Sequence, residues 1–200
     1  MRPTPIATPS PTLNARLDAL CVEGWAIWER FDFEVRNRAF HPFIAADYDA
    51  VRRALRLHAG SGVRFLEWGS ASGVITIMAD LYGADAFGIE LDDGLVATSR
   101  ALAERHRSRA RFVSGSFLPT GYRWPARSRD AEPPSLGFRP SGYLQLGRAL
   151  DEFDVVFGYP WAGQAPLMFD LMKRYGRTGA TLLLYDVDHG VRSYRDGAEV

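Results

Sequence analysis

The amino-acid sequence predicts an α/β fold built on a doubly wound, mostly parallel sheet. Short apolar runs that are typical of strands alternate with segments whose apolar residues recur at helical spacing. Each connection between predicted strands therefore contains a helix, as parallel pairing requires. The runs 155–157 and 182–184 are apolar at every position, which is typical of strands covered by helices on both faces.

Length and composition limit the classes of function. A chain of 200 residues that is 46% hydrophobic suffices for one domain, predicted over 13–200, which buries roughly 70% of the surface of the unfolded chain. The 24 basic and 24 acidic side chains balance, which argues against a dedicated nucleic-acid partner or an anionic membrane. No apolar run approaches the roughly 20 residues that span a bilayer. Cys21 is the only cysteine, which fits a reducing cytoplasm.

The N-terminal part predicts a tail and two helices. Residues 1–12 are rich in Pro, Thr and Ser and are expected to be flexible. Apolar residues at helical spacing from 13 to 28 predict a helix that begins after Thr12 as its N-cap. A second helix is predicted over 46–57, where Gly60 follows as a stop signal. We expect both helices to pack on the sheet.

The remaining chain supplies the sheet and its crossovers. Strands are predicted over 63–68, 86–91, 110–114, 153–158 and 180–186, and helices over 75–82, 95–106 and 166–175. The proline-rich stretch 118–150 is expected to be a long insert or lid rather than a core element. After the fifth strand, residues 191–195 could form one short strand, so the C-terminal strand region is shortened. The alternation of these strands and helices is a Rossmann-like arrangement. An exposed sheet edge would suit a homodimer.

A glycine-containing turn follows the first strand of the sheet. Residues 67–73 read Glu-Trp-Gly-Ser-Ala-Ser-Gly, and small side chains there let the backbone approach a ligand at a helix N-terminus. A nucleotide-like cofactor is expected, although a tight turn without a ligand is the alternative. The turn lacks the lysine of a P-loop, and the spacing of Gly69 and Gly73 differs from the nicotinamide-dinucleotide fingerprint.

An acid follows the second strand. Glu90 ends that strand, where a carboxylate can accept hydrogen bonds from both hydroxyls of a ribose held over the glycine turn. The two features together favour a nucleoside-containing cofactor.

From residue 62 to 186 the chain resembles the class I S-adenosylmethionine-dependent methyltransferases. The stretches that resemble the family's three motifs and its fourth and fifth strands are Phe65–Gly73, Gly88–Asp92, Phe112–Phe117, Phe153–Phe157 and Gly179–Leu183. The resemblance implies S-adenosylmethionine as cofactor and methyl transfer to an acceptor, expected to be a small molecule. A non-catalytic nucleoside-binding module is the alternative, and a nicotinamide oxidoreductase is disfavoured by the glycine spacing.

The resemblance also implies which residues bind the cofactor. They are Glu67, Gly69, Ser70, Ala71, Ser72 and Gly73 for the methionine part, Glu90 with Leu91 following it for the ribose, and Ser116 and Phe117 for the adenine. Two positions depart from the family pattern, since Ala71 stands where a second glycine is usual and Ser116 where many members have aspartate.

Candidate catalytic residues follow the fourth and fifth strands, where the ligand crevice of such a sheet lies. Tyr159 and Trp161 would face the methyl group, or Trp161 would pack under a helix in a structural turn. Gly158 lacks the acceptor side chain of the amine-methylating motif, which argues against methylation of an exocyclic base amine. His189, close to Asp186, could be a general base, or it belongs to a solvated loop. No metal set is complete.

Two groups of aromatic residues leave alternatives open. The insert interleaves arginines with aromatic residues that could bind nucleic acid, or it is a disordered or substrate-closing loop; these residues are Arg123, Trp124, Arg127, Arg129, Phe138, Arg139 and Tyr143. A second group could close over a cofactor or belong to the core, and it comprises Trp25, Trp28, Phe31, Phe33, Phe40 and Phe43. His41 and His58 show no partner pattern and receive no role.

Overall fold

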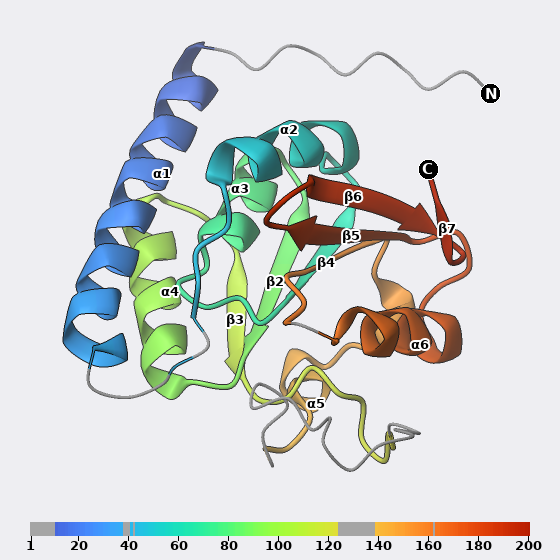
Figure 1. The fold of residues 1–200 in the computed structure, drawn as a ribbon. Coiled ribbons are helices and arrows are strands. Elements are labelled where there is room, and N and C mark those ends of the chain that lie inside the picture. The colour runs from blue at the N-terminus through green and yellow to red at the C-terminus, as the bar shows by residue number, and fades with distance from the viewer. Residues whose placement is uncertain (1–10, 38–40, 42, 124–138, 162) are drawn as a thin grey trace.

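A seven-stranded sheet forms the centre of the molecule in a computed structural model, which describes residues 11–37, 41, 43–123, 139–161 and 163–200 (Figure 1). The strands are β1 (Arg64–Trp68), β2 (Asp85–Glu90), β3 (Arg111–Ser114), β4 (Val155–Gly158), β5 (Thr181–Asp186), β6 (Gly190–Arg195) and β7 (Ala198–Glu199). Their order is β3-β2-β1-β4-β5-β6-β7, with β1 to β5 parallel and β6 and β7 antiparallel. The order reverses between β1 and β4, which is where such sheets bind ligands.

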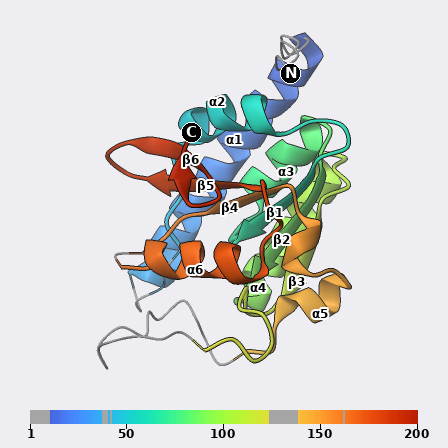
Figure 2. The ribbon, with the colours of Figure 1, turned by 90° about the vertical axis from the view of Figure 1, so that its right-hand side faces the viewer.

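Helices cover both faces of the sheet, which confirms the predicted doubly wound α/β fold. They are α1 (Pro11–Phe31), α2 (Tyr48–His58), α3 (Val74–Leu81), α4 (Asp93–Arg105), α5 (Gly142–Leu146) and α6 (Ala165–Tyr175), with a π-helical turn over Asp32–Arg36 and a 3-10 turn over Leu150–Glu152. Buried side chains of α1 to α4 share one core cluster, and those of α5 and α6 share the other. In Figure 2, α2 lies on one side of the sheet and α6 on the opposite side. No helix in the described part of the chain is long and apolar enough to cross a membrane.

The alternation of side chains along β1 links the two layers. Phe65 points into the layer of α1 to α4, whereas Leu66 and Trp68 point into the layer of α5 and α6. Both Phe65 and Leu66 are completely buried, and burying one such side chain contributes about 1.5–3 kcal/mol. The continuous apolar runs in the sequence therefore correspond to strands that are covered on both faces.

The two N-terminal helices form as predicted, with a different start for the first. Helix α1 begins at Pro11, so Thr12 is not its N-cap and residues 11 and 12 belong to the helix. Proline suits a first helical position because its missing N–H would have no intrahelical partner there. The rest of the predicted tail lies outside the described residues. Asp47 caps α2 by accepting hydrogen bonds from the N–H groups of Asp49 at 2.8 Å and Ala50 at 3.1 Å.

The predicted C-terminal strand over 191–195 is confirmed as β6, but the expectation that it stands alone is wrong, because β7 follows it. Strand β6 pairs with β5 along six residue pairs, and β7 pairs with β6. Residues 187–189 alone connect β5 to β6, so no helix intervenes. Asp196 and Gly197, with φ of +50° and +85°, join β6 to β7 in left-handed conformations. Asp-Gly is a strong signal for such a hairpin turn, and it was the signal that the sequence analysis missed.

Within 118–150, which was predicted to be an insert or lid, residues 141–150 pack against the core. Tyr143 of α5 is buried, and its hydroxyl accepts a hydrogen bond from the Trp68 indole N–H at 2.8 Å. Ser141 forms a β-bridge with Ser116. Because prolines interrupt the periodicity of 118–150, the sequence did not reveal this segment, in which Tyr143 and Leu150 are buried in the core. Residues 124–138 lie outside the described part of the chain.

Candidate functional site

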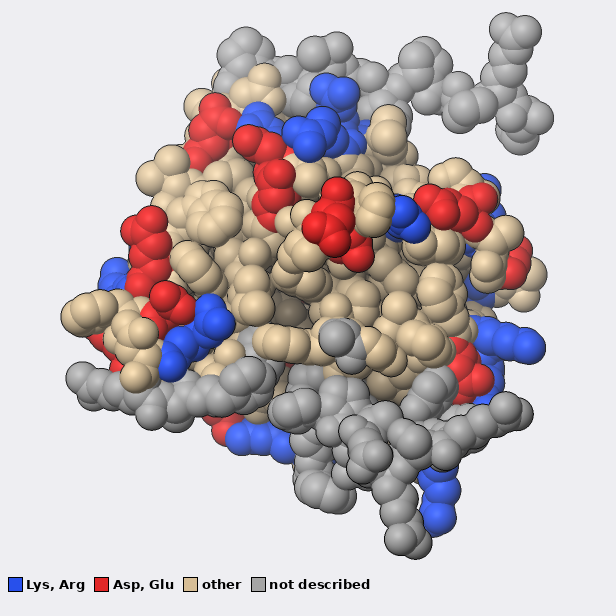
Figure 3. Space-filling model, viewed as in Figure 1, with Lys and Arg blue, Asp and Glu red and all other residues tan. Residues whose placement is uncertain are grey.

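A cavity of about 650 Å³ lies at the carboxyl ends of the parallel strands. Its walls come from the ends of β1, β2, β4 and β5, from the residue after β3, and from His41, Phe43 and Ile44 between α1 and α2. Figure 3 shows a hollow in this face of the molecule, surrounded mainly by uncharged atoms. The volume lies within the range of small-molecule sites.

The turn after β1 forms one wall. Gly69, Ala71 and Gly73 adopt left-handed conformations with φ of +70°, +45° and +81°. The N–H groups of Gly69 and Ser70 donate to the Ile89 carbonyl at 2.9 and 3.0 Å, which fixes the turn to β2. A side chain at Gly69 would enter open space, and Gly69 and Ala71 line the cavity. Ala71 carries a side chain in a conformation that favours glycine, at a cost of about 1–2 kcal/mol.

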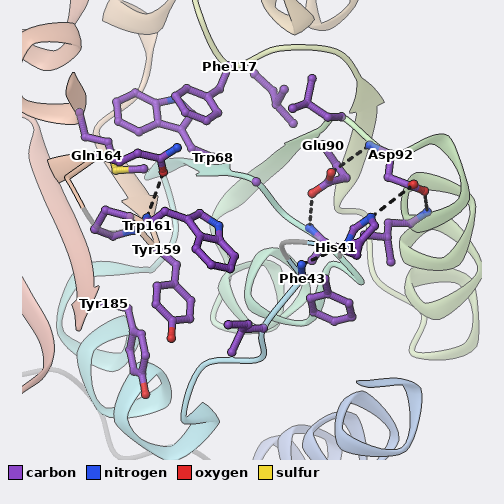
Figure 4. A pocket seen from close by; sticks show the side chains of 18 of the residues that line it. His41, Phe43, Trp68, Glu90, Asp92, Phe117, Tyr159, Trp161, Gln164 and Tyr185 are labelled. Carbon is purple, nitrogen blue, oxygen red and sulfur yellow. Dashed lines mark hydrogen bonds and ion pairs between the residues drawn. The ribbon is translucent and has the colours of Figure 1, made fainter. Parts of the chain in front are cut away.

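Glu90 completes this wall from the end of β2. Its Oε2 accepts a hydrogen bond from the Ala71 N–H at 2.8 Å, and its Oε1 accepts one from the Asp92 N–H at 2.9 Å (Figure 4). Burial raises the pKa of Glu90, while these backbone hydrogen bonds oppose the rise. Because each carboxylate oxygen has more than one lone pair, Glu90 can accept hydrogen bonds from a ligand as well.

The other predicted residues of the turn build it from behind. Glu67 is buried outside the cavity lining, where it accepts hydrogen bonds from the Thr76 N–H at 2.9 Å and from the Thr76 hydroxyl. Burial raises the pKa of Glu67 to about 8. Ser70 and Ser72 are also buried. A Cβ at Gly73 would lie 2.6 Å from Ser99 Cβ, so glycine there allows α4 to approach.

The wall next to β3 places Phe117 in the cavity and Ser116 outside its lining. Phe117 stacks on Trp68 with ring centroids 5.5 Å apart and planes at 24°. The Ser116 hydroxyl accepts a hydrogen bond from the Leu118 N–H at 3.1 Å. Leu91 also lines the cavity. Arg139 borders it and donates to both carboxylate oxygens of Asp93, at 2.9 and 2.8 Å.

His41 is a lining residue that the sequence analysis left without a role. Its Nδ1 accepts a hydrogen bond from the Phe43 N–H at 3.1 Å, and its Nε2 lies 3.6 Å from Asp92 Oδ2. Phe31 packs against both the His41 and Phe43 rings, at 4.7 and 5.2 Å between centroids. The partner Asp92 is far along the sequence, so no local pattern could reveal the pair.

The opposite wall follows β4 and β5. The backbone N–H of Trp161 donates to Gln164 Oε1 at 3.0 Å. The Trp161 ring lines the cavity rather than packing beneath a helix. Tyr159 contacts Tyr185 edge to face, with centroids 4.7 Å apart. The Tyr185 hydroxyl accepts a hydrogen bond from the Asp47 N–H at 3.0 Å, which fixes this ring to the start of α2.

His189 lies outside the cavity lining. Its exposed ring places Nδ1 2.8 Å from Asp186 Oδ1, and this contact, with backbone N–H groups, lowers the pKa of Asp186. Asp186 itself lines the cavity, whereas Asp188 does not. Among the described residues, no group of three or more His, Cys, Asp or Glu side chains could hold a metal ion.

The two aromatic groups divide between core, surface and cavity. Of the insert residues, Arg139 lines the cavity, Tyr143 is buried and Arg123 is exposed; the other four lie outside the described part. Of the second group, Phe43 lines the cavity, and Phe33 is 75% exposed. The remaining described aromatic residues of that group do not line the cavity, and they are Trp25, Trp28 and Phe31. Phe40 lies outside the described residues.

The chain is similar to methyltransferases of known sequence and known structure. No family model matches the chain. Over 103 residues it is 30% identical to the ribosomal protein L11 methyltransferase of Thermus thermophilus, a match that covers 48% of this chain and 41% of that protein. The chain thus spans less than half of that relative.

Two solved structures have similar folds. An RNA methyltransferase from Salinibacter ruber, in complex with S-adenosyl-L-homocysteine, superposes with a TM-score of 0.54 at 19% identity, covering 72% of this chain and 78% of that one. A precorrin-6y C5,15-methyltransferase from Geobacter metallireducens superposes with a TM-score of 0.51 at 16% identity, covering 75% and 69%. These likenesses show the fold that the chain shares with both.

Proposed function

We propose that this chain, whose Rossmann-like fold is that of S-adenosylmethionine-dependent methyltransferases, binds S-adenosylmethionine and transfers its methyl group to a small molecule. One observation carries the proposal. The Gly69–Gly73 turn and the Glu90 carboxylate are joined by the Ala71 N–H hydrogen bond and share one wall of the cavity. The fold and the relative from Thermus thermophilus support the reaction class.

The lining residues fit the cofactor. Glu90 retains lone pairs for two ribose hydroxyls, and Leu91 and Phe117 offer apolar surface to an adenine ring. The open space at Gly69 leaves room for the methionine part. Three carboxylates line the cavity, from Glu90, Asp92 and Asp186, and their negative charge suits a sulfonium ion.

Methyl transfer of this kind is an in-line displacement, for which the bound cofactor supplies an activated methyl group. The protein must align the acceptor and keep the cavity dry. Gln164 holds the backbone of Trp161, and Asp47 holds Tyr185 against Tyr159. These contacts fix the aromatic wall opposite Glu90. Its apolar rings support a small-molecule acceptor, and Cys21 as the only cysteine supports a cytoplasmic setting.

A second candidate is a nucleoside-binding module without catalysis. The position of Ser116 favours it, because the hydroxyl faces Leu118 rather than the cavity and the family's usual carboxylate is missing there. Turnover distinguishes the two candidates. Methyl transfer to any acceptor would exclude the module.

Calorimetric titration with S-adenosylhomocysteine, with NADH as the control ligand, tests the proposal. We expect micromolar binding of S-adenosylhomocysteine alone. Gly69→Val should abolish it by filling the turn. Gly179→Val is the matched control, because Gly179 has a similar φ of +78°, also faces open space and does not line the cavity. Tighter binding of NADH, or retained binding in Gly69→Val, would contradict the proposal.

A further inference from the structure

We infer that the methyl acceptor is a small basic amine, recognised by the rings of Tyr159 and Trp161 and by the carboxylate of Asp186. This inference rests on the proposed function and concerns the half of the cavity opposite Glu90. We refer to that half as the acceptor wall, formed by Tyr159, Trp161, Gln164, Met168, Tyr185 and Asp186.

The geometry places aromatic surface between the cofactor residues and the rim. Figure 4 shows the Trp161 ring between Glu90 on one side and the Tyr159–Tyr185 pair on the other. Both Tyr159 and Trp161 are partly exposed to the cavity, so their rings are accessible to a ligand. Ring faces attract cations, most strongly where water is excluded.

The charge on the acceptor wall has one sign. Among the described residues of this wall, Asp186 is the only one with a charged side chain, and hydrogen bonds from His189 and from the Asp188 N–H lower the pKa of Asp186. Arg139, on the wall next to β3, already forms two hydrogen bonds with Asp93. An anionic acceptor would therefore approach a carboxylate, and none of the described residues of this wall has a cationic side chain to receive it.

The placement of bases also favours an amine. A hydroxyl acceptor must lose a proton as it attacks, whereas a neutral amine already presents a lone pair. His41 is the only histidine among the described residues of the cavity lining; its Nδ1 accepts from the Phe43 N–H, and its Nε2 faces Asp92. Asp186, with its lowered pKa, is a weak base.

The charge balance of the reaction matches the wall. The amine nitrogen forms a bond to the methyl carbon as the carbon–sulfur bond breaks, and the electron pair of that bond stays on sulfur. The acceptor enters this step as the neutral amine, after its ammonium form has released one proton to water. The positive charge then passes from sulfur to nitrogen, and the methylated amine keeps it as an ammonium. The rings and Asp186 stabilise the charge where it arrives. A basic amine also needs no side chain in place of Gly158, in contrast to an exocyclic base amine.

Binding of two charge-matched probes tests the inference. Protein saturated with S-adenosylhomocysteine is titrated with benzyltrimethylammonium, which resembles a methylated product, and with benzoate. We expect the ammonium to bind about tenfold more tightly than benzoate. Asp186→Asn should weaken ammonium binding about threefold. Asp188→Asn is the matched control, since Asp188 lies two residues after Asp186 and outside the cavity lining. The ammonium affinity of this variant should equal that of the wild type.

Two variants of Tyr159 test the role of the ring. Tyr159→Phe keeps the ring face and should retain ammonium binding, whereas Tyr159→Leu should lose about tenfold. S-adenosylhomocysteine affinity should stay the same in Asp188→Asn and in both Tyr159 variants. Equal or tighter binding of benzoate, or loss in Asp188→Asn equal to that in Asp186→Asn, would overturn the amine acceptor alone. Failure of the wild-type protein to bind S-adenosylhomocysteine would overturn the methyltransferase assignment as well.

Discussion

Glu67 and Glu90 show how position decides the role of a single residue type. Both end or nearly end a parallel strand, and burial raises the pKa of both. Glu67 faces α3 and holds the turn through Thr76, whereas Glu90 faces the cavity and holds the turn through Ala71. Glu67 therefore supports the turn from outside the cavity, and Glu90 forms part of the cavity wall.

Replacing Glu90 by alanine should weaken S-adenosylhomocysteine binding by about 1–3 kcal/mol, the usual cost of leaving polar groups without partners. Calorimetry on the variant measures this, with circular dichroism to confirm folding. Glu104→Ala is the control because Glu104 is an exposed residue of α4 away from the cavity. Unchanged affinity in folded Glu90→Ala would contradict the ribose role.

The pKa of Glu67 predicts a pH dependence of stability. In the folded protein the pKa of the Glu67 carboxyl group is about 8, whereas the ordinary pKa of a glutamate side chain is 4.5. Because the folded state binds more protons between these values, the free energy of unfolding should fall as pH rises from about 4.5 to about 8. Urea denaturation of wild type and Glu67→Gln at several pH values measures how steeply the free energy of unfolding falls with pH. The fall should be smaller in the glutamine variant. Glu104→Gln should keep the wild-type slope, and an equal slope in Glu67→Gln would refute the assignment.

At the scale of elements, short segments fix the cavity walls to one another. Asp47 caps α2 through its side chain, and its N–H donates to Tyr185 of β5. Helix α5 connects the stretch after β3 to Trp68 at the end of β1 through Tyr143. The aromatic walls thus depend on contacts between elements that are distant in sequence.

Tyr143→Phe should destabilise the fold by about 1–3 kcal/mol, because the buried Trp68 indole N–H loses its acceptor. Tyr175→Phe is the matched control, since Tyr175 is 37% exposed at the end of α6. Denaturation midpoints of the two variants against wild type provide the measurement. A lid would tolerate the first change, so equal midpoints would argue that α5 is not part of the core.

For the whole molecule, the cavity joins both layers of the fold. Its walls come from both halves of the sheet and from His41, Phe43 and Ile44, which lie between α1 and α2 in the sequence. A ligand bound there contacts many elements at once and should stabilise the native state as a unit. The homodimer through a sheet edge stays a prediction, and the two-residue strand β7 leaves little edge for pairing.

Thermal denaturation should therefore respond to the cofactor product. At a free concentration of 100 times Kd, S-adenosylhomocysteine should add about 2.7 kcal/mol to the free energy of unfolding. A rise in Tm is expected with this ligand, and none with NADH. A shift that persists in Gly69→Val would place the ligand elsewhere.

The sequence by itself determined the alternation of β1 to β5 with α3, α4 and α6, and among the residues it proposed for the cofactor are five that line the cavity: Gly69, Ala71, Glu90, Leu91 and Phe117. These follow from local causes: apolar periodicity, the spacing of Gly69 and Gly73, and an acid at a strand end. Local patterns did not predict strand β7, although Asp196–Gly197 is a hairpin signal. They also did not predict that 139–150 contains core residues, because prolines in 118–150 indicated an insert.

Only the tertiary structure decided how distant residues combine. It brought His41 to Asp92, Tyr143 to Trp68, and Tyr185 to Asp47. It also separated two neighbouring candidate site residues, since Asp186 lines the cavity whereas His189 does not. Local patterns report the period and the caps of each element. Contacts across the sheet depend instead on register and on which face each element packs against, and those are settled only when the whole chain folds.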